Sequence, residues 1–175
     1  MSNRQLEYSE TNNEKISHQL IVVAENIHSP ENVGSIFRIC DALGVQKLYL
    51  TGVSPKLDNR KVKKTSRSTH EYLENEHVTE SSSVIHKYKE KGFSCLGLEI
   101  TSSSQAIHQY SFEVRGKILL VIGSERNGVQ SDTLLQLDDC VHIPMFGNNS
   151  SMNVATALGI GLYEMVRQNL IVTKF

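Results

Sequence analysis

Apolar and polar residues follow one another along the chain in blocks that predict strands and helices in turn. Short, nearly continuous apolar runs predict strands at residues 19–24, 47–51, 76–78, 93–100, 117–123 and 140–144. Segments with helical periodicity predict helices at residues 32–43, 82–91, 131–137 and 152–169. Apolar strands that alternate with helices indicate an α/β fold, with a parallel sheet covered by helices on both faces.

The polar block at residues 1–18 differs from the rest of the chain because it has no periodicity. We expect a flexible N-terminal arm or surface cover there, followed by one domain at residues 19–175. The 175 residues, 39% of them hydrophobic, are enough for one domain that buries roughly 70% of its unfolded surface.

No stretch approaches the roughly 20 apolar residues that span a bilayer, and no signal-peptide core is visible. We therefore expect a cytoplasmic protein without a membrane partner.

Cysteine and histidine spacing gives no indication of a metal site. Cys40, Cys95 and Cys140 each lie beside apolar residues and lack C-x-x-C spacing, which favours buried reduced thiols over a disulfide framework or a zinc site. The seven histidines are scattered without ligand spacing. We therefore expect no metal.

Charge is balanced overall but concentrated in one segment. A net charge of −1 argues against a protein that holds nucleic acid by its overall charge. Five cationic side chains nevertheless fall within eight residues: Arg60, Lys61, Lys63, Lys64 and Arg67. A contact with RNA phosphates and an ordinary solvated basic loop explain this segment about equally well.

Three clusters of glycine and polar residues each follow a predicted strand. They read NVGSIFR at residues 32–38, GSERNG at residues 123–128 and IPMFGNNSSMN at residues 143–153. Parallel α/β sheets bind ligands beyond the carboxyl ends of their strands, so the three clusters are expected to meet at one edge of the sheet. Neither G-x-G-x-x-G after the first strand nor a P-loop motif is present, and the usual nucleotide-binding interpretations lose their main support.

The first cluster opens a predicted helix. Gly34 would let another chain or a ligand approach the backbone closely, and Arg38 follows one turn later among apolar neighbours. An isolated arginine of this kind is usually a solvated residue on an amphipathic helix. Its functional interpretation is a fork of donors for a phosphate or a developing oxyanion.

The other two clusters predict loops beside the same edge. Gly123, Glu125 and Gly128 fit a tight loop with exposed amides, although a plain strand-to-helix turn with a solvated glutamate would look the same. In the third cluster, Ser150 or Ser151 is placed to cap the last helix. Small residues spaced four apart on that helix suit close packing of helices, either in the core or across a dimer.

Taken together, the three clusters resemble the signature of the SpoU-type (TrmH-like) branch of the SPOUT RNA methyltransferases. The resemblance runs from about Leu20 to Arg167. It implies an α/β parallel-sheet SPOUT fold with a C-terminal trefoil knot, a homodimer with the active site completed across its interface, and S-adenosylmethionine as cofactor. The implied activity is methyl transfer to a ribose 2′-hydroxyl of tRNA or rRNA.

The resemblance also implies site residues. The implied catalytic positions are Arg38, Asn32, Glu125, Ser151 and Asn153. The implied cofactor-binding positions are Leu98, Glu99, Ile100, Thr101, Gly123, Glu125, Gly128, Ile143, Met145, Ser151, Met152 and Asn153.

Two other interpretations compete with a methyltransferase. A catalytically silent RNA-binding member of the same fold is disfavoured because a binding module would not need the arginine, glutamate, serine and asparagine together. A small-molecule α/β enzyme would need a nucleophile or cofactor signature that the sequence lacks.

Because a guanidine does not readily lose its proton, Arg38 is better suited to stabilise an alkoxide than to act as a simple base.

Overall fold

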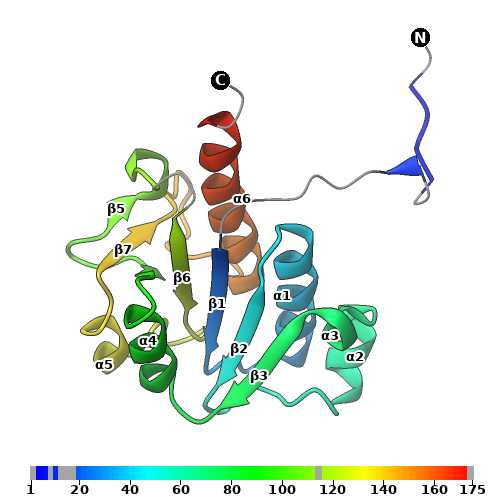
Figure 1. The fold of residues 1–175 in the computed structure, drawn as a ribbon, viewed down its shortest axis with the longest axis horizontal. Coiled ribbons are helices and arrows are strands. Elements are labelled where there is room, and N and C mark those ends of the chain that lie inside the picture. The colour runs from blue at the N-terminus through cyan, green and yellow to red at the C-terminus, as the bar shows by residue number, and fades with distance from the viewer. Residues whose placement is uncertain (1–2, 8–9, 12–18, 113–115, 173–175) are drawn as a thin grey trace.

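The computed structural model describes residues 3–7, 10–11, 19–112 and 116–172, and a parallel seven-stranded sheet lies at its centre (Figure 1). Its strands are β1 (Gln19–Glu25), β2 (Lys47–Thr51), β3 (Glu74–Val78), β4 (Ser94–Leu98), β5 (Gln105–Ala106), β6 (Lys117–Ile122) and β7 (Asp139–His142). They lie in the order β3-β2-β1-β6-β4-β7-β5, and every pair is parallel. The predicted parallel α/β sheet is confirmed.

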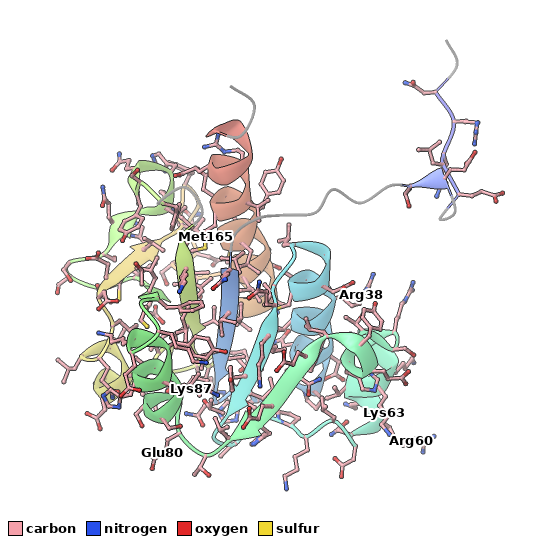
Figure 2. The ribbon with its side chains drawn as sticks, in the orientation of Figure 1. Arg38, Arg60, Lys63, Glu80, Lys87 and Met165 are labelled. Atoms are coloured by element: carbon pink, nitrogen blue, oxygen red, sulfur yellow. The ribbon has the colours of Figure 1, made fainter. Side chains whose placement is uncertain are left out.

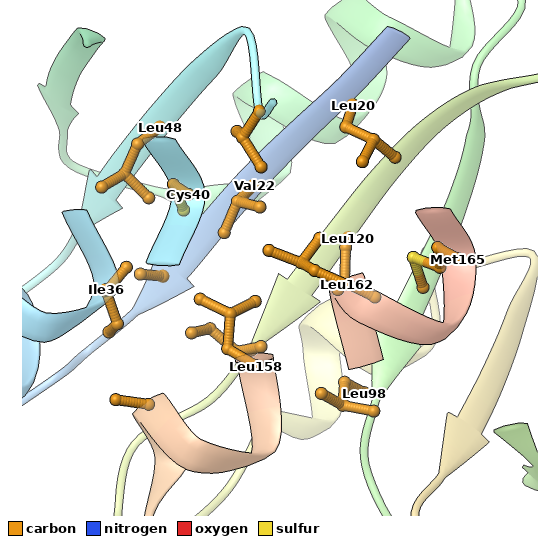
Figure 3. Packing of buried hydrophobic residues seen from close by; sticks show 14 of the residues in the cluster. Leu20, Val22, Ile36, Cys40, Leu48, Leu98, Leu120, Leu158, Leu162 and Met165 are labelled. Carbon is orange, nitrogen blue, oxygen red and sulfur yellow. The ribbon is translucent and has the colours of Figure 1, made fainter. Parts of the chain in front are cut away.

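Helices cover both faces of the sheet (Figure 1). They are α1 (Pro30–Ala42), α2 (Arg60–Ser66), α3 (Thr69–Tyr72), α4 (Ser81–Lys89), the 3-10 helix η2 (Ile107–Gln109), α5 (Ser131–Leu134) and α6 (Val154–Val172). Because strand side chains alternate between faces, each strand contributes to two separate cores. One core lies between the sheet and helices α1 and α6 (Figure 3), and the other lies under α4.

Several predicted elements differ in extent from those observed. The basic segment is the helix α2 rather than a loop, β5 and η2 were not predicted, and the predicted helix at residues 131–137 is the shorter α5. The prediction of a flexible arm at residues 1–18 falls largely outside the described residues. In the described part of the arm, Arg4 and Glu10 form an exposed ion pair at 2.6 Å.

The cysteines are free thiols in three different settings. Cys40 and Cys95 are buried as predicted, whereas Cys140 is only half-buried. Burial raises the pKa of the Cys95 thiol to about 11, so this side chain stays protonated and packs as an apolar group.

Within the described part of the chain, none of the helices has the length and apolar character needed to cross a membrane.

Gly34 allows helix α2 to pack closely against α1. A Cβ at Gly34 would lie 2.5 Å from Thr65 Cβ and 2.9 Å from the backbone nitrogen of Ser66. The close approach that the sequence predicted at this glycine is therefore made by α2 of the same chain. Because residues 65 and 66 belong to the basic helix, Gly34 determines where that helix lies.

We expect Gly34→Ala to destabilise the protein by about 1–3 kcal/mol, because the added methyl group would overpack the contact between α1 and α2. Urea unfolding measures the effect. Ser35→Ala is the matched control, since the Ser35 hydroxyl only donates to the Glu31 carbonyl within α1 at 3.0 Å. That control should stay within about 0.5 kcal/mol of the parent. Equal stability of the two variants would contradict the tight contact.

Candidate active site

The carboxyl ends of β4, β6 and β7 open into a pocket of about 520 Å³. This volume lies within the usual range of roughly 300–1,000 Å³ for small-molecule sites. The apolar part of its lining consists of Leu98, Ile100, Ile122, Ile143, Met145, Met152, Val154 and Ala157. Segments from the second and third sequence clusters therefore meet at one edge of the sheet, as the strand pattern predicted.

The loop at residues 123–128 is closed on itself by two backbone hydrogen bonds. Ser124 N donates to Gly128 O, and Gly128 N donates to Ser124 O, both at 3.0 Å. A Cβ at Gly123 would overlap the backbone of Gly128 and Val129. Only glycine allows this closed turn, which forms one wall of the pocket.

Glu99 braces the same loop from the neighbouring strand. Its carboxylate accepts from the backbone N–H of Val129 at 3.0 Å and from its own neighbour Ile100 N at 2.9 Å. Gly128 has φ +64°, and a Cβ there would meet the Glu99 carboxylate. Because both Glu99 oxygens are occupied in this way, the side chain supports the wall of the pocket.

Three residues from the three clusters are joined by side-chain hydrogen bonds. Asn32 Nδ2 donates to Glu125 Oε1 at 2.7 Å, and Asn153 Nδ2 donates to Asn32 Oδ1 at 3.0 Å. Glu125 also accepts from the backbone N–H of His28 at 3.0 Å and of Ser29 at 3.1 Å. These bonds connect residues that are 93 and 121 positions apart, and they fix the start of α1, the loop at residues 123–128 and the start of α6 relative to one another.

The hydrogen bonds to Glu125 also keep it ionised. Partial burial alone would raise the pKa of this carboxyl, but the donors at His28 N and Asn32 Nδ2 outweigh it and hold the pKa below its usual value. A carboxylate in this state is a poor proton acceptor. Glu125 therefore suits a positioning and electrostatic role better than general-base catalysis.

Asn153, rather than a serine, caps the last helix. Its Oδ1 accepts from Ala155 N at 3.0 Å and from Thr156 N at 3.2 Å. The prediction that Ser150 or Ser151 caps this helix is therefore wrong. Asn153 has both a carboxamide oxygen for the cap and an NH₂ group for Asn32, which a serine hydroxyl could not serve together. Both serines instead line the pocket.

Arg38 lies on α1, away from the pocket lining of its own chain. Its side chain is exposed and makes no hydrogen bond or ion pair with any described residue. Six residues separate it from Asn32, which places it about 9 Å farther along the helix axis. In Figure 2 its side chain lies on the same side of the molecule as Lys63 and Arg60 of α2. Arg38 is thus an unpaired cation beside the basic helix.

Most of the predicted cofactor-binding residues line the pocket. All of them do so except Thr101 and Asn153. Thr101 N donates to Ser104 Oγ at 2.9 Å, and Ser104 Oγ lies 3.0 Å from Nδ1 of His142, which does line the pocket. Thr101 and Asn153 therefore hold the surrounding loops in place.

Sequence reasoning missed some of the lining. The additional residues are Ile122, Ser124, Arg126, Asn127, His142, Ser150, Val154 and Ala157. All of them except Ala157 lie inside or directly beside a cluster that the sequence analysis singled out, so adjacency to the clusters was the available signal; Ala157 lies one helical turn past the third cluster. Among the described residues, no group of three or more histidine, cysteine, aspartate or glutamate side chains could hold a metal ion.

The predicted RNA-binding residues lie together on or beside α2. Asn59 caps this helix by accepting from Lys61 N at 2.9 Å, and Arg67 follows its last turn in a left-handed conformation. Lys61 Nζ lies 3.0 Å from Glu31 Oε1 of α1. The remaining cations, Arg60, Lys63, Lys64 and Arg67, form no ion pair with a described residue.

The fold is that of a SpoU-type methyltransferase domain. Residues 19–163 match the model of the SpoU rRNA Methylase family. The chain belongs to this family, as its three clusters indicated.

Individual relatives agree with this family. The chain is 31% identical over 158 residues to the tRNA (guanosine(18)-2′-O)-methyltransferase of Aquifex aeolicus, covering 89% of this chain and 72% of that one. It is 33% identical to mouse tRNA (guanosine(18)-2′-O)-methyltransferase TARBP1, covering 87% of this chain but 10% of that protein. The solved structure of the SpoU methyltransferase AviRb from Streptomyces viridochromogenes in complex with AdoMet superimposes with a TM-score of 0.81. It is 26% identical, and the match covers 94% of this chain and 65% of that one.

Proposed function

We propose that this protein transfers a methyl group from S-adenosylmethionine to a ribose 2′-hydroxyl of tRNA or rRNA. The observation that carries the proposal is the hydrogen-bonded connection from Glu125 through Asn32 to Asn153 beside an apolar pocket. The relatives named tRNA 2′-O-methyltransferases and the AdoMet complex of AviRb support the same activity.

The pocket has the chemical character that S-adenosylmethionine requires. Its apolar lining suits a purine ring, and Gly123 and Gly128 leave their backbone accessible where a Cβ would fill the turn. Residues of the three strand ends, Leu98, Gly123 and Ile143 with their neighbours, would hold the cofactor. When bound, S-adenosylmethionine supplies an electrophilic methyl group on a sulfonium.

Arg38 is proposed to stabilise negative charge on the attacking ribose oxygen. A guanidinium keeps its proton at any physiological pH, so it lowers the cost of alkoxide formation and does not remove the proton itself. A phosphate of the substrate is proposed to take that proton. Asn32 and Glu125 orient the loops around the reacting atoms, and Ser151, which lines the pocket without a hydrogen bond to a described residue, is free to contact substrate.

Because Arg38 lies off the pocket of its own chain, we propose that the active site is completed by a second copy in a homodimer. An apolar groove of about 690 Å³ runs between α1 and α6, and it includes Ala42, which lies one turn past Arg38 on the same face of α1. Phe146 is 96% exposed and Tyr163 is 61% exposed beside it. Such a surface suits a symmetric interface, and Arg38 at its margin would face the pocket of the partner.

The remaining features implied by the family are also proposals. We propose a trefoil knot in the C-terminal third and a cytoplasmic location. The knot is supported by the strand order β6-β4-β7-β5, in which the chain crosses repeatedly between neighbours, and by the match to AviRb.

A catalytically silent RNA-binding protein is the alternative to the proposed enzyme. The unpaired Arg38 side chain and a pocket suited to the methyl donor together favour the enzyme.

The acceptor atom provides the direct test. With a cognate RNA, replacing the target nucleotide by its 2′-deoxy form should eliminate incorporation of radiolabelled methyl groups while leaving RNA binding largely intact. A ribose oxygen is then the acceptor. Continued incorporation into the deoxy substrate would show that a base is methylated, and incorporation into neither RNA would support the catalytically silent alternative.

The basic helix is expected to contact RNA phosphates. Neutralising Lys63, Lys64 and Arg67 to glutamine should weaken tRNA binding and flatten its salt dependence by up to roughly 0.7–0.9 in log-log slope per lost contact. Lys61→Gln is the comparison, because Lys61 is already paired with Glu31 and should matter less. Filter binding at several salt concentrations measures both. An unchanged slope in the triple variant would return this segment to an ordinary solvated surface.

A further inference from the structure

A second concave site lies at the amino ends of the strands, at the sheet edge opposite the active-site pocket. It is a groove of about 590 Å³, and we call it the lysine groove after Lys47, Lys87, Lys91 and Lys117, which line it. Lys47 begins β2 and Lys117 begins β6. Since side chains alternate along a strand, Lys47 lies on the same face as Tyr49, the face that α4 covers. Lys87 is on α4 itself (Figure 2).

Three of the four lysines have no carboxylate of a described residue within ion-pairing distance. Lys47 Nζ is paired with Glu74 at 2.9 Å and Glu76 at 3.0 Å. The other three, Lys87, Lys91 and Lys117, make no ion pair with any described residue. Lys87 Nζ donates to the Tyr49 hydroxyl at 3.3 Å, and Lys117 Nζ donates to the Lys91 carbonyl at 3.1 Å. The groove therefore keeps a local excess of positive charge in a protein whose net charge is −1.

Buried aromatic rings hold these lysines in place. Lys91 Nζ lies 5.3 Å from the ring centroid of Tyr88, and Lys117 Nζ lies 5.8 Å from that of Phe93. Tyr88 and Phe93 are themselves buried and pack edge to face, with centroids 4.8 Å apart. Such contacts order the long lysine side chains before any ligand binds, which lowers the entropic cost of binding.

Tyr49 also lines the groove. Burial would raise the pKa of its phenol, but its hydrogen bonds to Tyr88 and Lys87 and the nearby charge of Lys47 together hold that pKa below its usual value. Two of the lining lysines thus contribute to this shift beside the neutral Tyr88. The groove is thus concave, cationic and ordered, and the methyl-transfer site does not use it.

We propose that the lysine groove binds the phosphodiester backbone of RNA at a point separate from the methyl-transfer pocket. The assignment of RNA as the anion rests on the proposed function. The lysines come from β2, α4, the segment after α4, and β6, and β1 lies between β2 and β6. Because Lys47 pairs with Ile21 and Lys117 pairs with Gln19, these two first residues are staggered by two positions and lie about 12 Å apart. Dispersed point charges without a loop of convergent amides suit a chain of phosphates better than a single phosphate group.

The two RNA contacts would lie on opposite edges of one sheet. The six residues of β6 separate the edges by about 20 Å. An RNA that presents its target nucleotide to the pocket would place a second backbone segment in the groove. The groove would thus supply affinity without reading sequence, because phosphate contacts position an RNA and carry no base information.

The test is the salt dependence of binding to unfractionated tRNA. The triple variant Lys87→Gln, Lys91→Gln, Lys117→Gln should bind more weakly, with a log-log slope reduced by up to roughly 0.7–0.9 per lost contact. Lys89→Gln is the matched control, because Lys89 is on α4 next to the groove but is paired with Asp138 at 2.7 Å. This control should keep the parent slope. All four substitutions are at lysines outside the buried cores, and circular dichroism checks that each variant is folded.

A second measurement distinguishes the source of the phosphate. In acetylation footprinting, tRNA should protect Lys87, Lys91 and Lys117 but leave Lys89 reactive. An unchanged slope and footprint would overturn the proposal. Protection by adenosine monophosphate or inorganic phosphate, with tRNA binding unaffected in the triple variant, would also overturn it and assign the groove to a small phosphorylated ligand. Because the experiment measures RNA binding and needs no catalysis, its result can be interpreted even if the protein does not transfer methyl groups.

Discussion

Arg38→Ala is expected to reduce methyl transfer by about 10²–10³-fold while leaving the affinity for S-adenosylmethionine unchanged. The loss follows because a donor that stabilises charge in the transition state typically contributes a factor of this size. The affinity is retained because Arg38 lies outside the pocket lining of its own chain. Arg38→Lys should remain inactive, since an ammonium group lacks the planar fork of a guanidinium. Single-turnover methylation and calorimetry measure the two effects.

Mixed dimers determine which copy supplies the arginine. With S-adenosylmethionine kept below its Kd for the parent, Arg38→Ala should be nearly inactive alone and Gly123→Ala should keep about a tenth or less of the parent activity, whereas their co-expressed mixture should recover about a quarter of it per site. Half of the random dimers then hold one copy with an intact pocket facing an intact arginine from the partner. If Arg38 served the pocket of its own chain, the mixture would stay below about a tenth of the parent activity. Recovery therefore requires both the dimer and action across its interface.

Gly123→Ala is expected to lower the affinity for S-adenosylmethionine by tenfold or more. The added methyl group would overlap the backbone of Gly128 and Val129, so the loop could close only by shifting, at a cost of about 1–3 kcal/mol. Calorimetric titration of the methyl donor measures this loss.

Gly147→Ala is the matched control for the pocket glycine. It follows the same sheet edge in the third cluster, but nothing lies within 4 Å of the position its Cβ would take. This variant should bind the methyl donor like the parent. Equal affinities for the two alanine variants would show that the closed turn at residues 123–128 does not form part of the donor site.

The strands and the location of the site could be predicted because both depend on local patterns. The apolar run at residues 118–122 is a central strand, and its carboxyl end leads directly into Gly123. The helix α2 could not be predicted in this way. Its charged sequence has no apolar period, and it is held against α1 by the contact at Gly34, which is remote in sequence.

Residues with long-range partners were the hardest to interpret. Local capping rules could not rank Ser150, Ser151 and Asn153, and the hydrogen bond from Asn32 to Asn153 is visible only in the fold. The buried Glu25 is similar. Its carboxylate accepts from Thr133 Oγ1 at 2.6 Å and Ser81 Oγ at 2.7 Å, and these partners are 108 and 56 positions away. Such hydrogen-bond networks form only in the assembled sheet, so residues adjacent in the sequence do not reveal them.

The connection from Glu125 through Asn32 to Asn153 also sets when activity can arise during synthesis. Asn32 leaves the ribosome early, but its second partner follows 121 residues later. The hydrogen bond between Asn32 and Asn153 therefore cannot form until the ribosome has moved well past Asn153. A nascent chain that stops before this point can form most of the sheet, but it lacks the residue that joins the first cluster to the start of α6. The proposed activity therefore depends on a contact that can form only late in synthesis.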